Sequence, residues 1–314
     1  KLTVNQDDYF HRHLFYADDK GTTGSAITFF EWPQLPQGFA GLSSPHHLSY
    51  SVPSLESLPR WKSWLLFNGI PVTGPLVRDE RVSLYLRDPD GLMVELTFLT
   101  NENIKQAYLD EIGKNLEVRD VTKEMRLREF NHASPVTADP SLAVTFFEKV
   151  LALKSTQSLP NPDQPDGTIV AIGNKEDEGF LRYLAPKQAR DGFVGRGSVH
   201  HIAMVVEDAD GQRKVKQRLD EIGITNSGII DRLWFKSLYF RDLDGNLLEV
   251  ATKGPGYTKD ESPDSLGSKL VLPPWLEDRR QVIEKTLDEL DSSNRATWPP
   301  KFPEVPKVPE KLRT

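Results

Sequence analysis

Two histidines stand side by side at the start of an apolar, strand-like run, His200 and His201 in "GSVHHIAMVV". Successive side chains on a strand point to opposite faces, so the two imidazoles cannot share one role. A carboxylate, Glu249, lies inside a second apolar run, "LLEV", where it is costly unless it is paired or bound to a metal. A histidine and a glutamate on one face of a sheet could hold a divalent cation. The plainer interpretation places one histidine at the rim and makes the other a hydrogen-bonded core residue.

The same pattern occurs twice in the chain. The segment that begins at His46 aligns without a gap with the segment that begins at His200. One constant offset pairs the following residues: His47 with His201, Gly69 with Gly223, Arg78 with Arg232, Tyr85 with Tyr239, Asp90-Gly91 with Asp244-Gly245, and Glu95 with Glu249. So many matches at one offset indicate a duplication.

Each copy predicts the order β-α-β-β-β. An alternating run opens the copy, and an amphipathic helix follows that ends at a glycine. A weaker extended stretch comes next, and a strand, a tight Asp-Gly turn and a last strand close the copy. Residues 126–185 resemble a third, more diverged copy, and residues 1–32 match only the back half of such a unit. Because the chain has no initial Met and begins in strand-like sequence, we expect it to be an incomplete copy of a longer protein.

The predicted fold class is therefore α+β, built of tandem βαβββ modules whose first member is N-terminally incomplete. We expect an N-terminal half at 1–115, a linker at 116–125 and a C-terminal half at 126–257. A packing tail at 258–290 should contain a helix from about Trp275 to Leu290, with Ile283 and Leu287 on one face. Residues 291–314, rich in Pro and Lys, predict a disordered tail.

Composition excludes several classes of function. The 314-residue chain has a net charge of −7 and no basic stripe, so nucleic acid or an anionic membrane is not expected as a partner. It has no cysteine, which removes disulfides, thiolate metal sites and cysteine nucleophiles. Neither a membrane-spanning run nor a signal peptide is visible. The default expectation is a soluble cytoplasmic protein, and the sequence leaves open whether it forms a homo-oligomer.

Together, these motifs resemble the vicinal oxygen chelate superfamily of glyoxalases, bleomycin resistance proteins and extradiol dioxygenases. Within it, the sequence is most similar to the ring-cleaving dioxygenases that act on hydroquinones and catechols. The likeness covers roughly residues 1–290 and rests on "KLTVNQDD", "YADDKGTTGSAITFFEWP", "YFRDLDGNLLEVAT" and "GPGYTKDESPDSLGSKLVLPPWLEDRR". The resemblance implies paired modules that curl mixed sheets around a metal cavity, a small aromatic substrate, and O₂.

By the same resemblance, His201 and Glu249 bind a divalent metal, usually Fe(II), with Mn(II) or another divalent ion as alternatives. Two imidazoles and one carboxylate on one face leave open positions for a substrate oxygen and O₂. The resemblance gives His200, Arg232 and Tyr239 catalytic roles beside the metal, as an acid-base group, a partner for an anionic oxygen, and a hydrogen-bonding residue. We interpret His11 and His13, in "HRHLFY", as exposed strand residues.

The third ligand depends on which modules pair. If consecutive modules pair, His132 in "EFNHAS" completes a triad with His201 and Glu249. If they pair crosswise, as in the hydroquinone-cleaving branch, His132 joins His47 and Glu95 in a second triad, with Ser134 two residues after the histidine. The corresponding ligand for His201 and Glu249 would then lie on a strand that this sequence does not contain.

Two other functions stay open. One is a glyoxalase-type isomerase that uses Ni or Zn, and the other is a protein of the same superfamily that only binds a small ligand. The duplicated Arg, Tyr and Glu pattern favours an enzyme, because a sequestering protein does not need these groups twice. Metal content and O₂ uptake distinguish the three functions.

Overall fold

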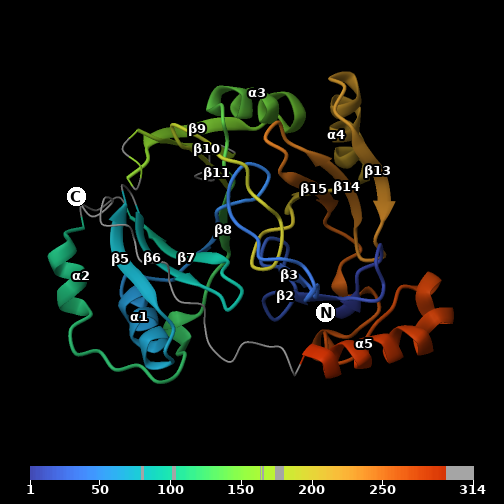
Figure 1. The fold of residues 1–314 in the computed structure, drawn as a ribbon, viewed down its shortest axis with the longest axis horizontal. Coiled ribbons are helices and arrows are strands. Elements are labelled where there is room, and N and C mark those ends of the chain that lie inside the picture. Colours follow the sequence, from blue (N-terminus) through green and yellow to red (C-terminus); the bar gives the residue numbers. More distant parts are fainter. Residues whose placement is uncertain (79–80, 101–103, 163, 165, 174–179, 295–314) are drawn as a thin grey trace. The chain divides into compact units, whose positions relative to one another are not determined.

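The structure, a computed structural model, describes the chain except for residues 79–80, 101–103, 163, 165, 174–179 and 295–314 (Figure 1). The fold is α+β, as the sequence predicts. Its contacts divide the chain into two compact units: residues 46–134 form one, and residues 1–45 together with the described residues from 135 onward form the other. The predicted division into halves around 116–125 stays a prediction.

Residues 46–134 form a mixed sheet covered by a helix. Its strands lie in the order β5-β6-β7-β4-β8, and β4 runs parallel to β7 while the other neighbours are antiparallel. The elements are β4 His47–Ser51, α1 Ser57–Phe67, β5 Val72–Arg78, β6 Arg81–Arg87, β7 Met93–Leu99, α2 Gln106–Ile112 and β8 Phe130–Ser134. Leu58 and Leu65 of α1 pack on Leu84 and Leu96 of the sheet to form its core.

The other unit contains three groups of paired strands, and a helix contacts two of them. In the first, β10 Thr168–Gly173 lies between β9 Lys154–Pro160 and β11 Leu181–Ala185, and α3 Pro140–Leu151 contacts β9 and β10. In the second, the order is β12-β15-β14-β13, and α4 contacts all four strands. Its elements are β12 Ile202–Val206, α4 Ala209–Glu221, β13 Asn226–Asp231, β14 Lys236–Arg241 and β15 Leu247–Thr252.

The second and fourth modules have the predicted order β-α-β-β-β, and so does the third if β8 is counted as its first strand. In both duplicated copies the glycine after the helix has a positive φ, 73° at Gly69 and 74° at Gly223. This left-handed conformation ends a helix and suits glycine because it has no Cβ. The predicted helix ends are therefore confirmed.

Residues 1–32 form a three-stranded antiparallel sheet of β1 Leu2–Val4, β2 Arg12–Tyr16 and β3 Ile27–Phe30. In the tail, the α-helix α5 Arg280–Asn294 begins later than predicted, because a 3-10 segment at Pro274–Arg279 follows the Pro-Pro break. Ile283 and Leu287 are buried against Val4, as one face of the helix requires. The helix continues past residue 290, and residues 295–314 of the predicted disordered tail lie outside the described residues.

Contacts within each unit follow the crossed arrangement of modules. In residues 46–134, β8 pairs antiparallel with β4, so the first strands of the second and third modules are neighbours. In the other unit, residues 1–32 contact the fourth module: Arg232 donates two hydrogen bonds to Asp7, and the Phe15 ring lies 6.3 Å from the Trp234 ring. Among the described helices, none is long and apolar enough to cross a membrane.

Candidate metal centres

His201 and Glu249 lie together on one face of the β12-β15-β14-β13 sheet. Because β12 runs parallel to β15 with Ala203 opposite Glu249, the histidine just before β12 points along the same face. His201 Nε2 lies 3.0 Å from Glu249 Oε2. Burial raises the pKa of Glu249, but the hydrogen bond and the charge of His201 act in the opposite sense and hold this pKa below its usual value.

The neighbouring strand supplies further groups around this carboxylate. Tyr239 is the register partner of Glu249, and Ser237 donates a hydrogen bond to Glu249 Oε1. Burial and the charge of Glu249 raise the pKa of Tyr239 to about 12, so its hydroxyl keeps its proton at neutral pH. The Arg232 guanidinium lies 5.4 Å from the centre of the Tyr239 ring.

Arg232 is held in place by a residue near the start of the chain, Asp7. Its Nη1 and Nη2 donate to the two carboxylate oxygens of Asp7, at 2.9 and 2.7 Å. Such a two-point contact fixes the orientation of a guanidinium better than its charge alone would. The sequence did not single out Asp7, because the contact joins residues that are 225 positions apart in the chain.

His200 lies beside His201 and next to two aromatic residues, Phe30 and Trp32. Its Nδ1 is 2.9 Å from His201 Nδ1, and its ring meets the rings of Phe30 and Trp32 at 5.1 and 5.5 Å between centres. Burial, followed by the charges of His201 and Arg241, lowers the pKa of His200 to about 4. The imidazole is therefore neutral near pH 7 and can accept a hydrogen bond through a ring nitrogen that carries no proton.

His13 is not the exposed strand residue that we predicted. It lies opposite Phe30 across β2 and β3, and its ring packs against Phe15 and Phe30 at 4.1 and 4.2 Å between centres. Its Nε2 is buried without a hydrogen-bond partner. Burial and the neighbouring His201 lower the pKa of His13 to about 3. The strand period of two, which puts His13 on the face of the buried Phe15, was the signal that could have identified it.

A second group of metal-ligating residues lies in residues 46–134. His47, Glu95 and His132 offer one ligand atom each, and these atoms all lie within 4.8 Å of one another. His47 and Glu95 are the duplicates of His201 and Glu249, and Tyr85, the duplicate of Tyr239, donates a hydrogen bond of 2.7 Å to Glu95.

His132 comes to this group because β8 pairs with β4, with Ser49 of β4 opposite His132 and also opposite Glu95 of β7. The structure thus brings His132 to His47 and Glu95, which is the crossed alternative. The other alternative, in which His132 completes a triad with His201 and Glu249, stays a prediction.

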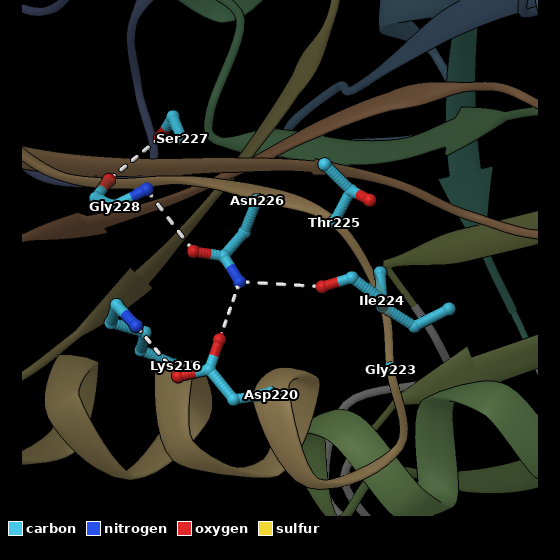
Figure 2. A pocket seen from close by; sticks show the side chains of 8 residues that line it. All are labelled: Lys216, Asp220, Gly223, Ile224, Thr225, Asn226, Ser227 and Gly228. Atoms are coloured by element: carbon cyan, nitrogen blue, oxygen red, sulfur yellow. Dashed lines mark hydrogen bonds and ion pairs between the residues drawn. The ribbon is translucent and has the colours of Figure 1, made fainter.

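A shallow hollow lies elsewhere, between the end of α4 and the start of β13 (Figure 2). Its polar side chains bind one another: Asn226 Nδ2 donates to Asp220 Oδ1 at 2.9 Å, and Lys216 Nζ to Asp220 Oδ2 at 2.6 Å. Because these groups are already paired, the hollow offers no acid, base or metal ligand in need of a partner.

Comparisons with known proteins agree with this geometry. Residues 129–250 match the Glyoxalase/Bleomycin resistance protein/Dioxygenase superfamily. The chain is 32% identical over 293 residues to MhqA of Bacillus subtilis (strain 168), a protein named for ring-cleaving dioxygenase activity, with 91% of this chain and 89% of the relative covered. It is 27% identical to the chlorohydroquinone/hydroquinone 1,2-dioxygenase of Sphingobium indicum, over 88% of this chain and 83% of the relative.

Solved structures show the same fold. A crystal structure described as a dioxygenase from Bacillus subtilis superposes with a TM-score of 0.76 at 27% identity, covering 91% of this chain and 87% of that one. Glyoxalase I from Zea mays superposes with a TM-score of 0.56 at 16% identity, over 81% and 83% of the two chains. The chain belongs to the glyoxalase/bleomycin resistance/dioxygenase superfamily, and its curated relatives carry the names of ring-cleaving dioxygenases.

Proposed function

We propose that the protein is an Fe(II)-dependent, extradiol-type ring-cleaving dioxygenase for a hydroquinone- or catechol-type aromatic, and that the reaction takes place beside His201 and Glu249. The observation that carries the proposal is the 3.0 Å distance between His201 Nε2 and Glu249 Oε2. Around this pair, Tyr239 lies opposite Glu249, Arg232 lies near the Tyr239 ring, and His200 lies beside His201. The names of the relatives support this choice of reaction.

The residues present fit a divalent metal. Glu249 is only 4% exposed, and a buried carboxylate needs a cationic or hydrogen-bonding partner. His201 and Glu249 would hold the ion, which when bound would bring the substrate oxygen and O₂ together and relay electrons between them. His132 was predicted as the third ligand, but it lies beside His47 and Glu95 of its own sheet. This proposal therefore assigns two protein ligands, His201 and Glu249.

Arg232 and Tyr239 would bind the oxygen that develops negative charge. The Arg232 cation is oriented by Asp7 and stabilises a phenolate where it approaches the metal ligands. Tyr239 keeps its proton because its pKa is raised to about 12 by burial and by Glu249, and it can donate a hydrogen bond to the same oxygen.

His200 would move the proton. Because burial first and the charge of His201 second lower its pKa to about 4, His200 is neutral at pH 7 and would accept a hydrogen bond from the phenolic hydroxyl as that proton leaves. The rings of Phe30 and Trp32 that border it give an aromatic substrate apolar faces on which to stack. A dioxygenase incorporates both atoms of O₂ as one ring C–C bond breaks, so no external reductant is needed.

The proposal is tested by adding hydroquinone, chlorohydroquinone or catechol to protein that has been reconstituted anaerobically with Fe(II). We expect O₂ uptake equal to the substrate consumed and a ring-opened product with a new near-ultraviolet absorption. If the protein is active only with Ni(II) or Zn(II), and converts a hemithioacetal rather than these aromatics, the result would instead support the isomerase. Ligand binding without O₂ uptake under any metal would support a binding protein.

A further inference from the structure

We propose that His13 and Tyr257 form a polar subsite that binds a second hydroxyl of the aromatic substrate, across the ring from the oxygen that binds beside Glu249. The subsite would favour a hydroquinone over a catechol. It rests on the proposed function, because the first oxygen is placed at the His201–Glu249 pair.

His13 lies on the wall of the site that β2 and β3 supply. Its ring packs against Phe30 at 4.2 Å between centres, and the Phe30 ring lies 6.3 Å from the ring of His201. Burial first, and then the charges of His201, Arg232 and His200, lower the pKa of His13. The three site residues therefore lie within electrostatic reach of this imidazole, and one aromatic ring separates it from His201.

The imidazole of His13 has a nitrogen to offer to a ligand. Its Nε2 is buried and has no hydrogen-bond partner among the residues that the structure describes. Such a polar atom is costly and uncommon in a folded protein. Because its pKa is lowered to about 3, the ring is neutral at pH 7, and a neutral imidazole has one donor and one acceptor nitrogen. A hydroxyl can donate and accept, so it can bind Nε2 in either tautomer.

Tyr257 brings a second polar group to the same wall from the segment that follows β15. It belongs to the motif "GPGYTKDE", and its ring lies 5.4 Å from the Phe15 ring, which in turn lies 4.1 Å from the His13 ring. Burial and then the charge of Glu249 raise the pKa of Tyr257 to about 12. Its hydroxyl therefore keeps its proton at neutral pH and can donate a hydrogen bond.

The surroundings of these two groups suit an aromatic ligand. Phe15 and Phe30 both pack against His13, and Phe235 lies 6.3 Å from the ring of Tyr257. A mostly aromatic wall with a few polar groups is typical of a site that binds and orients a small ring. Both His13 and Tyr257 keep part of their surface exposed, so a ligand can reach them, and a small rotation of the imidazole would bring Nε2 to its hydroxyl.

The position of the subsite distinguishes two kinds of diol. The hydroxyls of a hydroquinone stand at opposite ends of the ring, whereas those of a catechol are neighbours. With the first oxygen beside Glu249, only the hydroquinone places its second hydroxyl about one ring away, where His13 lies. A site that is built to hydrogen-bond a hydroxyl discriminates strongly against a ligand without it, because the polar groups of the protein then stay unpaired.

Equilibrium binding tests the subsite without turnover. Full-length protein loaded with Fe(II) is titrated in the absence of O₂ with hydroquinone, phenol or catechol in a calorimeter. We expect wild type to bind hydroquinone about tenfold more tightly than phenol, as one hydrogen bond allows. In His13→Phe the two Kd values should agree within about twofold, while the Kd of phenol, which has no second hydroxyl, keeps its wild-type value.

Two further variants separate hydrogen bonding from packing. Tyr257→Phe removes only a hydroxyl and should lower the preference for hydroquinone about threefold. His13→Gln offers an amide nitrogen near the position of Nε2 and should restore part of the preference that His13→Phe loses. His11→Phe is the matched control, because His11 contacts Asp8 and Gln34, and it should keep the wild-type ratio of the two Kd values.

Circular dichroism shows whether each variant is folded. A wild type without preference for hydroquinone, or a wild-type ratio in folded His13→Phe or in folded Tyr257→Phe, would overturn the proposal. An equal loss of affinity for phenol and hydroquinone in His13→Phe would also overturn it, since that result means packing alone. If the preference depends on His13 but no O₂ is taken up, the dioxygenase proposal fails and the subsite stands. If wild type binds neither ligand, both proposals fail.

Discussion

Tyr239 lies directly opposite Glu249 across the antiparallel pairing of β14 with β15. Tyr85 has the same relation to Glu95 across β6 and β7. The duplication thus kept a tyrosine beside each buried carboxylate, where its hydroxyl can position the carboxylate or a ligand bound to it.

Tyr239→Phe should lower kcat/KM for O₂ uptake by about 10- to 100-fold, the usual cost of losing a hydrogen-bonding neighbour of a metal ligand. The ring stays, so folding should be unaffected. Steady-state O₂ uptake measures the change. Tyr16→Phe, at a tyrosine that is 58% exposed, is the control. Equal rates for Tyr239→Phe and wild type would remove Tyr239 from the mechanism.

Arg232→Lys should raise KM for the aromatic substrate by about tenfold, because a lysine cannot keep the two-point contact with Asp7 while it binds an anionic oxygen. Asp7→Asn should have a smaller effect in the same direction, since Arg232 keeps its charge but loses its anchor. KM measured with each variant checks this order. Arg213→Lys, on the exposed side of α4, is the control and should leave KM unchanged. A larger increase of KM in Asp7→Asn than in Arg232→Lys would contradict the role of Arg232 in binding the substrate oxygen.

His13→Phe should reduce O₂ uptake by about tenfold or more while the fold is kept. Phenylalanine can fill the space beside Phe15 and Phe30, but it has no nitrogen to replace the buried Nε2 of an imidazole whose pKa is lowered by burial and then by the charge of His201. His11→Gln is the matched control, because His11 contacts Asp8 and Gln34 instead. Full activity in His13→Phe would show that His13 only packs.

Much of this arrangement could be predicted from the repeat alone. The constant offset identified His47 with His201 and Glu95 with Glu249. Strand alternation predicted that His201 lies on the face of Glu249, and their 3.0 Å contact confirms this. The partner of His132 could not be predicted, because periodicity shows which face a residue occupies and not which distant strand lies beside it. The pairing of β8 with β4 decides that question. Similarly, the ion pair of Asp7 with Arg232 joins residues that are 225 positions apart and leaves no local signal.

Gly223→Ala should destabilise the protein by about 1 kcal/mol, since an alanine at a φ of 74° is strained although its Cβ would meet no atom within 4 Å. Gly223→Asn should cost less, because asparagine tolerates this conformation. Denaturant unfolding of the two variants measures the difference. A stability loss that is equal in both would mean that backbone conformation is not the cause.

The central claim is that ring cleavage takes place beside His201 and Glu249, and Glu249→Gln tests it most directly. The substitution is nearly isosteric, so packing is kept while the charge that would offset the cation is lost. O₂ uptake with a hydroquinone should fall below detection in Glu249→Gln and stay at the wild-type rate in Glu221→Gln, at the exposed end of α4. Undiminished uptake in folded Glu249→Gln protein, with uptake lost in Glu95→Gln, would contradict the claim and place the reaction at His47, Glu95 and His132.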